Sequence, residues 1–515
     1  MSGMKNIDII NQRLSRGPLD KTGKAELARE LGISSAGLES ILTFYTPDRG
    51  EDLLCTGLPC RMKWQGRAIE MSVGAREESC LGYCDHAPVM RVEGKFVTVT
   101  GSGIAEIEES NHDFVKRNIE HISEYTLKGG YSYLEGEGGK IDGDGMLQRV
   151  EKSGLRGMGG AGFPVHLKWK SFRQFSNEDS YLLVNAHEGE PGTFKDRKIL
   201  ELAPHSVLDG AIIAAVSNGI RRIVVGIKKE YALGYASLTM AREELTERVR
   251  NSGHSIPEIE IIRAGGSYVT GEETALMEAL EGRRSEPRLR PPFPTEIGLY
   301  SRPTLVHNAE TLSAIASLAS SGKELLKSYC LSGDVKHPGT YRVKIGTALG
   351  KLMESSGNGP MTGVKAVMPG GLSGGILPGS NEELKLDFDS VRKAGAGLGT
   401  GSVIVLSSRR CMVETAENVA SFFMKESCGK CMPCRHGTKE LKEILSGARQ
   451  GRGSEIDLEN GGEIARMMID GSICALGQVA GRMYMDAVAH FRDEFLDHLK
   501  GVCRSESCFS GGMER

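Results

Sequence analysis

A chain of 515 residues is longer than a single hydrophobic core supports, so the sequence predicts several domains. Its 64 Lys and Arg against 67 Asp and Glu give a formal charge of -3, which gives no support for a surface that binds nucleic acid or an anionic membrane. A hydrophobic fraction of 39% excludes a mostly disordered chain.

The predicted cellular location depends on two features that the sequence lacks, a membrane-spanning helix and a secretory signal. The longest apolar run, near 211–216, is far shorter than the roughly 18 residues of a membrane-spanning helix, so we expect no direct membrane insertion. Asp8 and Asn11 interrupt the N-terminus before the apolar part of a secretory signal could form. We therefore expect a cytoplasmic protein, in which the 12 cysteines serve as ligands or redox groups rather than as disulfides.

Residues 1–50 have helical spacing of their apolar residues. Within them, residues 24–41 resemble a helix-turn-helix, with Gly32 at the turn and Ser34 as the cap of the second helix. That second helix carries Glu39 and no Arg or Lys, the residues with which a DNA-reading helix contacts phosphates and bases. We therefore expect no nucleic-acid partner.

Residues 51–105 consist of short predicted strands and turns with two pairs of cysteines, Cys55 with Cys60 and Cys80 with Cys84. Four and three residues separate the members of each pair, which is wider than a common zinc knuckle. The spacing favours a [2Fe-2S] cluster in which each iron binds one pair. Zinc or a regulatory dithiol is the alternative.

The next segments differ in composition. Residues 106–150 are polar, with glycines near 136–139 that indicate a linker. From 151 to about 320, apolar runs alternate with helical segments, which predicts α/β layers around a mainly parallel sheet. Residues 325–405 contain several Pro-Gly turns and predict a small β-rich domain, and the chain after Cys411 is helical.

A glycine-rich loop matches the pattern GxGxxG through Gly157, Gly159, Gly160 and Gly162. A dinucleotide-binding loop of this type follows a strand, whereas residues 146–155 predict a helix, so the standard Rossmann fingerprint is not met. Such a loop can still bring backbone N–H groups against a phosphate or a flavin ring, because glycine has no Cβ.

The most specific metal-binding motif joins Cys428, Cys431 and Cys434 with Cys474, forty residues further on. Three thiolates in seven residues and a remote fourth suit a [4Fe-4S] cluster. Zinc is again the alternative, although structural zinc usually takes two separated pairs. Four further cysteines, of which the first two are expected to be buried thiols, receive no role: Cys330, Cys411, Cys503 and Cys508.

Several longer motifs follow one another in a characteristic order: 154–169, 185–197, 266–276, 291–294, 308–312, and the Cys428 and Cys474 motifs. In this order they resemble the NADH-binding flavoprotein subunit of respiratory complex I and its soluble relatives. Residues 20–100 resemble the small thioredoxin-like [2Fe-2S] subunit of the same enzymes, through Thr43-Phe-Tyr45, both cysteine pairs and Ala87-Pro88. The chain therefore resembles a fusion of the two.

The resemblance implies a multidomain α/β fold. It has a helical segment at 1–50, a thioredoxin-like [2Fe-2S] domain at 51–105, a linker at 106–150, a Rossmann-like FMN- and NADH-binding domain at 151–324, a ubiquitin-like β-grasp (SLBB-like) domain at 325–405, and a C-terminal helical bundle holding [4Fe-4S] at 406–515.

The resemblance also implies the residues that contact FMN and NADH: Gly157, Gly159, Gly160, Gly162, Phe163, Lys168, Asn185, Glu188, Gly189, Glu190, Tyr268, Gly271, Glu272, Glu273, His307, Asn308 and Thr311. NADH is expected to stack on the flavin beside Phe163, with Glu272 or Glu273 near the adenosine ribose. His187 and His307 stand where the family usually has Asp and Asn, and Met158 replaces a usual Arg.

The implied function is that of an NADH:acceptor oxidoreductase (diaphorase) subunit. A hydride is exchanged between NAD(H) and FMN, and single electrons pass through the clusters to or from the iron–sulfur and catalytic subunits of a larger redox complex. The cofactor carries the chemistry, so no catalytic side chain is expected. The fusion favours the diaphorase module of an NAD-linked hydrogenase or formate dehydrogenase; the alternative is a zinc-stabilised regulatory or binding protein with a helix-turn-helix head.

Overall fold

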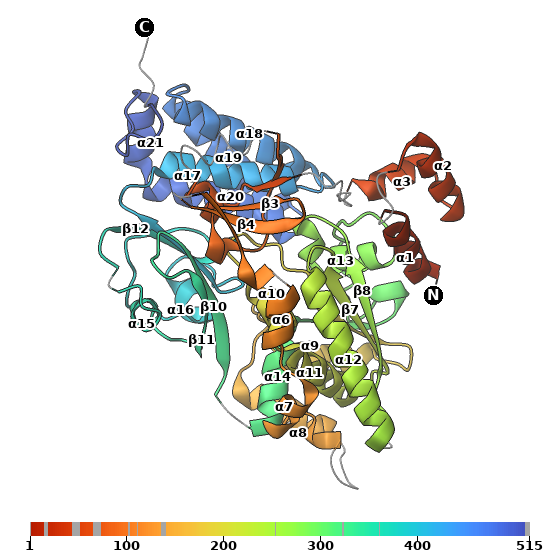
Figure 1. The fold of residues 1–515 in the computed structure, drawn as a ribbon. Helices are drawn as coiled ribbons and strands as arrows, with labels where there is room; N and C mark the ends of the chain where they lie inside the picture. The colour runs from red at the N-terminus through yellow and green to blue at the C-terminus, as the bar shows by residue number, and fades with distance from the viewer. Residues whose placement is uncertain are drawn as a thin grey trace.

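The computed structural model describes residues 2–14, 19–43, 52–64, 74–100, 103–110, 112–134, 141–252, 254–321, 324–359 and 361–509. Three sheets account for the strands in these ranges. Figure 1 shows the sheets among helices, with the C-terminal helices gathered at one end of the molecule. The predicted multidomain α/β protein with a parallel sheet is confirmed.

The first sheet is parallel throughout and has the strand order β8-β7-β6-β9. Its strands are β6 (Tyr181–Ala186), β7 (Arg222–Lys228), β8 (Glu258–Ala264) and β9 (Thr304–Asn308). The chain moves from β6 to β7 and β8 on one side and returns to β9 on the other. Ligands of such sheets bind at the carboxyl ends of the strands where the order reverses. Asn185 and Asn308, which are in register, lie at that place.

Helices cover both faces of this sheet. Leu182 and Val225 face a core formed with α8 (Gly143–Ser153), α9 (Val165–Phe175), α11 (Pro204–Ser217), α12 (Ala232–Ser252) and α14 (Ala309–Ser321). Leu183 and Val224, one position along their strands, face the opposite core with α13 (Glu273–Leu280) and α1 (Ser2–Leu14). Figure 1 shows α1 beside α13.

The helix-turn-helix segment consists of α2 (Lys21–Glu30) and α3 (Ser35–Leu42). Gly32 has a positive φ of 67° at the turn, and the Ser34 hydroxyl accepts the Gly37 N–H at 3.0 Å, as predicted. Leu27 and Leu38 join the sheet core described above, so the apolar face of this segment packs against the rest of the protein. Phe44 and Tyr45 of the predicted motif lie outside the described residues.

The second sheet has the order β2-β1-β3-β4-β5 and precedes the parallel sheet in sequence. Only β1 and β2 are parallel to each other. Its elements are β1 (Leu53–Cys55), α4 (Leu58–Arg61), β2 (Arg76–Glu78), β3 (Val89–Val92), β4 (Lys95–Thr100) and β5 (Gly103–Glu106). Both pairs of N-terminal cysteines belong to this unit.

The segment 106–150 differs from the predicted linker. It contains α6 (His112–Asn118), α7 (Ile122–Leu127) and the first part of α8. Tyr131 is fully buried, and the Tyr125 hydroxyl donates to Asp209 at 2.8 Å. The segment packs on α11 because its aromatic side chains find buried partners there. Residues 136–139, predicted as the hinge, lie outside the described residues.

The third sheet has the order β11-β10-β14-β12-β13, with β10 and β14 parallel and the other pairs antiparallel. Its elements are β10 (Leu326–Gly333), β11 (Gly339–Lys344), α15 (Leu349–Ser355), β12 (Val364–Leu372), β13 (Leu377–Pro378), α16 (Phe388–Lys393) and β14 (Ser402–Ser407). The predicted β-rich character of 325–405 agrees with this sheet.

The chain then forms a bundle of helices: α17 (Met412–Glu426), α18 (Met432–Arg449), α19 (Glu455–Gly471), α20 (Ala475–His490) and α21 (Arg492–Leu499). Phe422, Phe423 and Leu441 belong to its core. Because the motif cysteines lie at the junctions of these helices, the bundle sets the geometry of the predicted cluster.

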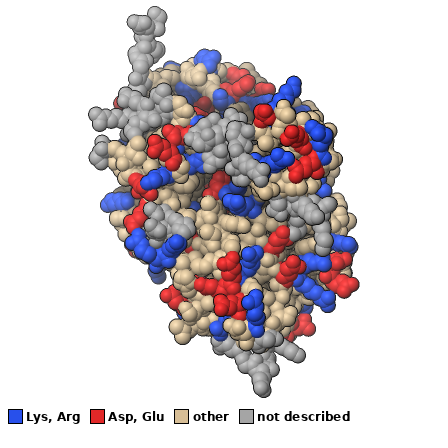
Figure 2. Space-filling model, turned by 45° about the vertical axis from the view of Figure 1, so that its right-hand side comes forward, with Lys and Arg blue, Asp and Glu red and all other residues tan. Residues whose placement is uncertain are grey.

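Two surface properties bear on possible partners. On the face shown in Figure 2, basic and acidic side chains are interspersed, as expected from the balanced composition. Over the described ranges, no single helix has both the length and the apolar composition needed to cross a membrane; one bent pair, α10 (Lys195–Leu202) with α11 at 96°, has them only together.

Three consecutive charged residues at the start of α10 are buried: Lys195, Asp196 and Arg197. Lys195 Nζ lies 2.8 Å from an Asp196 oxygen and 3.1 Å from a Glu310 oxygen on α14. Glu310 also pairs with Lys327 on β10, at 3.2 Å. Burial lowers the pKa of Lys195, but the two carboxylates outweigh it and hold the pKa above its usual value. The parallel sheet and the third sheet are therefore joined by buried charges.

We expect Lys195→Met to destabilise the protein by about 3–5 kcal/mol, because it removes the cation that pairs with buried Asp196 and leaves Glu310 with Lys327 alone. The matched control Lys344→Met removes an exposed pair with Glu324 and should cost less than about 0.5 kcal/mol. Urea unfolding followed by tryptophan fluorescence measures both. Equal stability of the two variants would contradict the role of the buried network.

Candidate active site

The turn after β6 brings several predicted site residues to the carboxyl end of the parallel sheet. Asn185 Nδ2 donates to the Gly271 carbonyl at 2.8 Å, and its Oδ1 accepts the His187 N–H at 3.2 Å. Gly189 lies against the backbone of Tyr268, where an added Cβ would come within 3.1 Å of Tyr268 Cα. The turn and the Tyr268–Gly271 segment thus form one wall of the site.

Two buried carboxyl groups of this turn have raised pKa values. Burial raises the pKa of Glu188 to about 8, with a further contribution from Asp196, although backbone N–H groups of Asp196 and Arg197 donate to it. Burial also raises the pKa of Glu190 to about 7 against hydrogen bonds from the Tyr268 hydroxyl at 2.7 Å and Ser373 N–H at 2.8 Å. Burial therefore shifts both carboxyl groups toward their protonated forms near neutral pH.

The two histidines at positions 187 and 307 are buried and neutral. Burial, with Lys228 nearby, lowers the pKa of His187 to about 3, and neither ring nitrogen has a hydrogen-bond partner. Burial, with Lys168 nearby, also lowers the pKa of His307, whose Nε2 accepts the Trp169 indole N–H at 2.8 Å. His187 therefore has unused hydrogen-bonding capacity in the site.

The glycine loop connects α8 to α9 and faces β9. As predicted, a helix and not a strand precedes it. The Met158 N–H donates to Thr311 Oγ1 at 2.9 Å, and a Cβ on Gly159 would lie 3.0 Å from Asn308 Cβ. Gly160 has a φ of 133° and an added Cβ would meet nothing within 4 Å, so the loop backbone borders open space. Phe163, at the end of the loop, is 51% exposed.

Lys168, Glu272 and Glu273 lie together beside this loop. Lys168 Nζ contacts Glu273 Oε2 at 3.3 Å and the Val306 carbonyl at 3.2 Å. Glu272 caps α13, where its Oε2 accepts the backbone N–H groups of Thr274 and Ala275. Arg290 pairs with both acids. Glu272 is thus engaged in capping, whereas Glu273 makes side-chain ion pairs only.

The second wall comes from β9 and α14. Asn308 Nδ2 donates to Asp196 Oδ2 at 2.7 Å. Asp196 therefore connects Asn308 to the buried charges at the start of α10. The sequence interpretation included 185–197 as a motif but gave no role to Lys195, Asp196 or Arg197, because charged residues at a helix start are usually solvated.

The cysteines of the C-terminal motif come together from two junctions of the helical bundle, α17–α18 and α19–α20. Cys428 follows α17, Cys431 is the N-cap of α18 with Cys434 in its first turn, and Cys474 is the N-cap of α20. Burial raises the pKa of Cys434 to about 12 and that of Cys474 to about 11. Two helix N-termini point toward the quartet, an arrangement that favours bound thiolates.

The N-terminal cysteines form the second quartet. Cys80 and Cys84 have their sulfurs 3.5 Å apart, and Cys84 Sγ accepts the Gly192 N–H at 3.2 Å. The Cys55 thiol donates to Cys60, which raises the pKa of Cys55, and Cys80 and burial raise it further. A single metal ion requires ligand atoms that lie close together, within about 4.8 Å of one another. Among the described residues, neither cysteine quartet has three sulfurs this close together. A cluster of several irons matches wider spacing.

Tyr268 connects the turn after β6 to the helical bundle. Its hydroxyl donates to Glu190, its backbone N–H donates to Glu426 Oε2 at 2.8 Å, and its ring packs on Phe422 with centroids 5.2 Å apart. Glu426 lies two residues before Cys428. The sequence analysis gave Glu426 no role, because no local pattern indicates its contact with Tyr268, 158 residues earlier in the chain.

The residues present fit a bound FMN. The open side of the glycine loop offers backbone N–H groups, the loop borders β9 at the reversal of strand order, and His187 has two unpartnered ring nitrogens. The sulfurs of Cys428, Cys431, Cys434 and Cys474 provide the donor set of a [4Fe-4S] cluster. The arrangement can hold a flavin on one side of Tyr268 and a cluster on the other.

Known proteins resemble the chain over the same regions. Residues 150–317 match the Nuo51 FMN-binding domain, and residues 414–498 match the NADH-ubiquinone oxidoreductase-F iron-sulfur binding region. An F subunit of the NADH-quinone oxidoreductase of Rhizobium meliloti is 38% identical over 398 residues, which cover 74% of this chain and 94% of the relative. The F subunit of the Aquifex aeolicus enzyme is 38% identical over 404 residues, 75% of this chain and 93% of the relative.

A solved structure is similar over almost the whole chain. It is that of an NAD+-reducing [NiFe]-hydrogenase in the H2-reduced state, with a TM-score of 0.82 and 29% sequence identity. The similarity covers 96% of this chain and 92% of the hydrogenase chain. The segment before residue 150 therefore has a counterpart in that structure, whereas the family-model matches begin at residue 150.

We expect Glu190→Gln to flatten the pH dependence of stability. A carboxyl whose folded pKa is about 7 stabilises the fold fully below its unfolded pKa, and this contribution is lost as the pH rises through about 7. Between pH 5.5 and 7, the unfolding free energy of Glu190→Gln should therefore fall less steeply with pH than that of the wild type, by up to about 1.4 kcal/mol per pH unit. Urea titrations check this, with exposed Glu354→Gln as the control; parallel curves for wild type and Glu190→Gln would contradict it.

Proposed function

The chain belongs to the family of NADH-quinone oxidoreductase F subunits, and from this premise we propose that it is the diaphorase subunit of a larger redox complex. When bound, FMN exchanges a hydride with NAD(H) and exchanges electrons singly with iron–sulfur clusters. The partners are the other iron–sulfur and catalytic subunits of that complex. The contact of Tyr268 with both Glu190 and Glu426 carries the proposal, because it joins the flavin wall to the cluster loop.

The chain's own residues bind and orient in this proposal. Asn185, Asn308 and the glycine loop hold the flavin at the reversal of strand order, and neutral His187 offers its ring nitrogens to it. Burial favours the protonated form of Glu190 beside the Tyr268 hydroxyl, which limits the negative charge at this wall. Phe163 and Lys168 border the side from which NADH approaches.

We propose that Cys55, Cys60, Cys80 and Cys84 hold a [2Fe-2S] cluster that relays or stores electrons. Its support is the direct contact between this quartet and the flavin turn. The Gly192 N–H donates to Cys84 Sγ, and Arg197 Nε donates to the Gly82 carbonyl at 3.1 Å. The Arg197 guanidinium also stacks on Tyr83, 3.9 Å from the ring centroid.

The finer domain assignment is likewise a proposal: thioredoxin-like at 51–105, Rossmann-like at 151–324, β-grasp at 325–405 and a cluster bundle at 406–515. The strand orders of the three sheets and the similarity to the hydrogenase chain support it. Because the N-terminal unit is fused to the flavin unit in one chain, we favour the diaphorase module of an NAD-linked hydrogenase or formate dehydrogenase over complex I.

The anaerobically purified chain should show flavin absorption over a broad iron–sulfur background, and a colourless zinc protein would contradict the function.

Cys431→Ala should lose about four irons per chain and Cys60→Ala about two, because each removes one cluster ligand. Both variants should keep FMN, and NADH should still reduce it. Iron analysis and electron paramagnetic resonance of the reduced variants distinguish the two losses; unchanged iron in either variant refutes that ligand set.

Coenzyme choice is expected to depend on Glu273, since Glu272 is engaged as a helix cap. A carboxylate near the adenosine ribose accepts a hydrogen bond from the 2′-OH of NADH and repels the 2′-phosphate of NADPH. We expect a strong preference for NADH. Glu273→Gln should reduce the ratio of kcat/KM for NADH to that for NADPH about tenfold or more, mainly by improving the use of NADPH. A tenfold change corresponds to about 1.4 kcal/mol. The ratio of kcat/KM values measures it, with exposed Glu383→Gln as the control. Equal use of both coenzymes by the unmutated protein would contradict this placement.

A further inference from the structure

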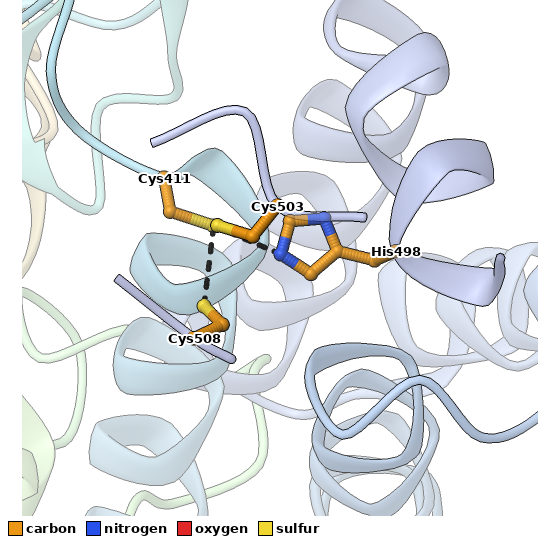
Figure 3. A group of neighbouring side chains, drawn as sticks. All are labelled: Cys411, His498, Cys503 and Cys508. Atoms are coloured by element: carbon orange, nitrogen blue, oxygen red, sulfur yellow. Dashed lines mark hydrogen bonds between the residues drawn. The ribbon is translucent and has the colours of Figure 1, made fainter. Parts of the chain in front are cut away.

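Four side chains that the proposed function leaves unused converge at the end of the helical bundle. They are Cys411, His498, Cys503 and Cys508, shown in Figure 3. Cys411 is the N-cap of α17, His498 lies in the last turn of α21, and the other two follow α21. Their candidate ligand atoms all lie within 4.8 Å of one another, which among the described cysteines holds for neither cluster quartet.

The distances match a single tetrahedral ion. Cys411 Sγ lies 3.7 Å from Cys508 Sγ and 3.3 Å from His498 Nε2. Ligand bonds of about 2.3 Å to sulfur and about 2.0 Å to nitrogen place two sulfurs about 3.8 Å apart, and sulfur and nitrogen about 3.5 Å apart. Figure 3 shows the imidazole and the three sulfur-bearing side chains pointing toward one another.

The surroundings prepare the four groups for binding. His498 is fully buried, and its Nδ1 lies 2.8 Å from the Glu494 carbonyl, which fixes the tautomer that leaves Nε2 free to bind a metal. Cys411 is 2% exposed, and its Sγ accepts the Glu414 N–H at 3.4 Å at the start of α17. A helix N-terminus at the sulfur favours the thiolate that a metal requires.

We propose that Cys411, His498, Cys503 and Cys508 bind one zinc ion that fastens the C-terminal segment to the beginning of α17. Three cysteines and one histidine are a common donor set of structural zinc, and a site with four protein ligands leaves no position for a substrate. Binding releases the three thiol protons to solvent while the imidazole binds neutral. The ion thus holds one end of α17, the helix whose other end carries Glu426 and leads to Cys428.

The alternative occupant is a disulfide between Cys411 and Cys508. Their sulfurs are 3.7 Å apart, which exceeds the roughly 2.05 Å of a sulfur–sulfur bond. A disulfide would also leave Cys503 and His498 without a common partner. A single ion accounts for all four residues.

Zinc content and zinc K-edge X-ray absorption of the anaerobically purified full-length protein test the proposal, because neither detects the iron of the clusters. We expect about one zinc per chain, with a shell of three sulfurs at about 2.3 Å and one nitrogen at about 2.0 Å. Zinc well below one per chain after growth with added zinc, an oxygen-rich shell, or two thiols lost to a disulfide would overturn it.

Two variants locate the ion. His498→Gln should lose the zinc, whereas the matched His490→Gln, on the exposed end of α20, should retain it. Cys503→Ser, in the part-buried C-terminal segment, also removes a ligand without altering the core of the bundle. It should lose zinc while FMN remains bound. Full zinc content in both His498→Gln and Cys503→Ser would refute the site, and it would leave the flavin function intact.

Discussion

Charges that are buried must be paired, and the site depends on this constraint at the start of α10. Lys195 pairs with Asp196 and Glu310, Asp196 accepts from Asn308, and Arg197 donates to the loop between Cys80 and Cys84. Each carboxylate or cation would be costly alone in this interior. The network therefore fixes the flavin walls, the third sheet and the N-terminal cysteines relative to one another.

The same burial reduces the charge of the flavin wall. It raises the pKa of Glu188 to about 8 and that of Glu190 to about 7, and the imidazoles of His187 and His307 remain uncharged. The wall therefore carries less charge near neutral pH than the same side chains would carry in water. Lys168 and Glu273 form an ion pair that is only partly buried, with side chains about a quarter exposed. Uncharged polar groups therefore line the proposed flavin site, whereas the buried ion pairs at the start of α10 stabilise the packing of the two sheets.

Part of the structure was predictable because local spacing encodes it. The spacing of Cys428, Cys431 and Cys434 predicted a shared site, and the structure places all three at the junction of α17 and α18. The Gly32 and Ser34 pattern predicted a turn and a cap, which the structure confirms. The contacts of Glu426 with Tyr268 and of Arg197 with Gly82 join segments more than a hundred residues apart, so no local pattern contains them. Cys411 was expected to be a buried thiol without a role, since no local pattern connects it to His498 and Cys508, which lie 87 and 97 positions away. The segment 106–150 was predicted to be a linker because its polar composition concealed Tyr125 and Tyr131.

The packing of α1 on the parallel sheet has a consequence for synthesis of the chain. Ile7 and Ile10 belong to the same buried core as Leu183, Val224 and Val306, and the Asn11 amide donates to the Arg263 carbonyl 252 positions away. At translation rates of about 5–20 residues per second, the first helix waits on the order of 15–60 s for its partners. During that time its apolar face remains exposed at the ribosome. Until the sheet is complete, this apolar face is a surface through which nascent chains can associate with one another.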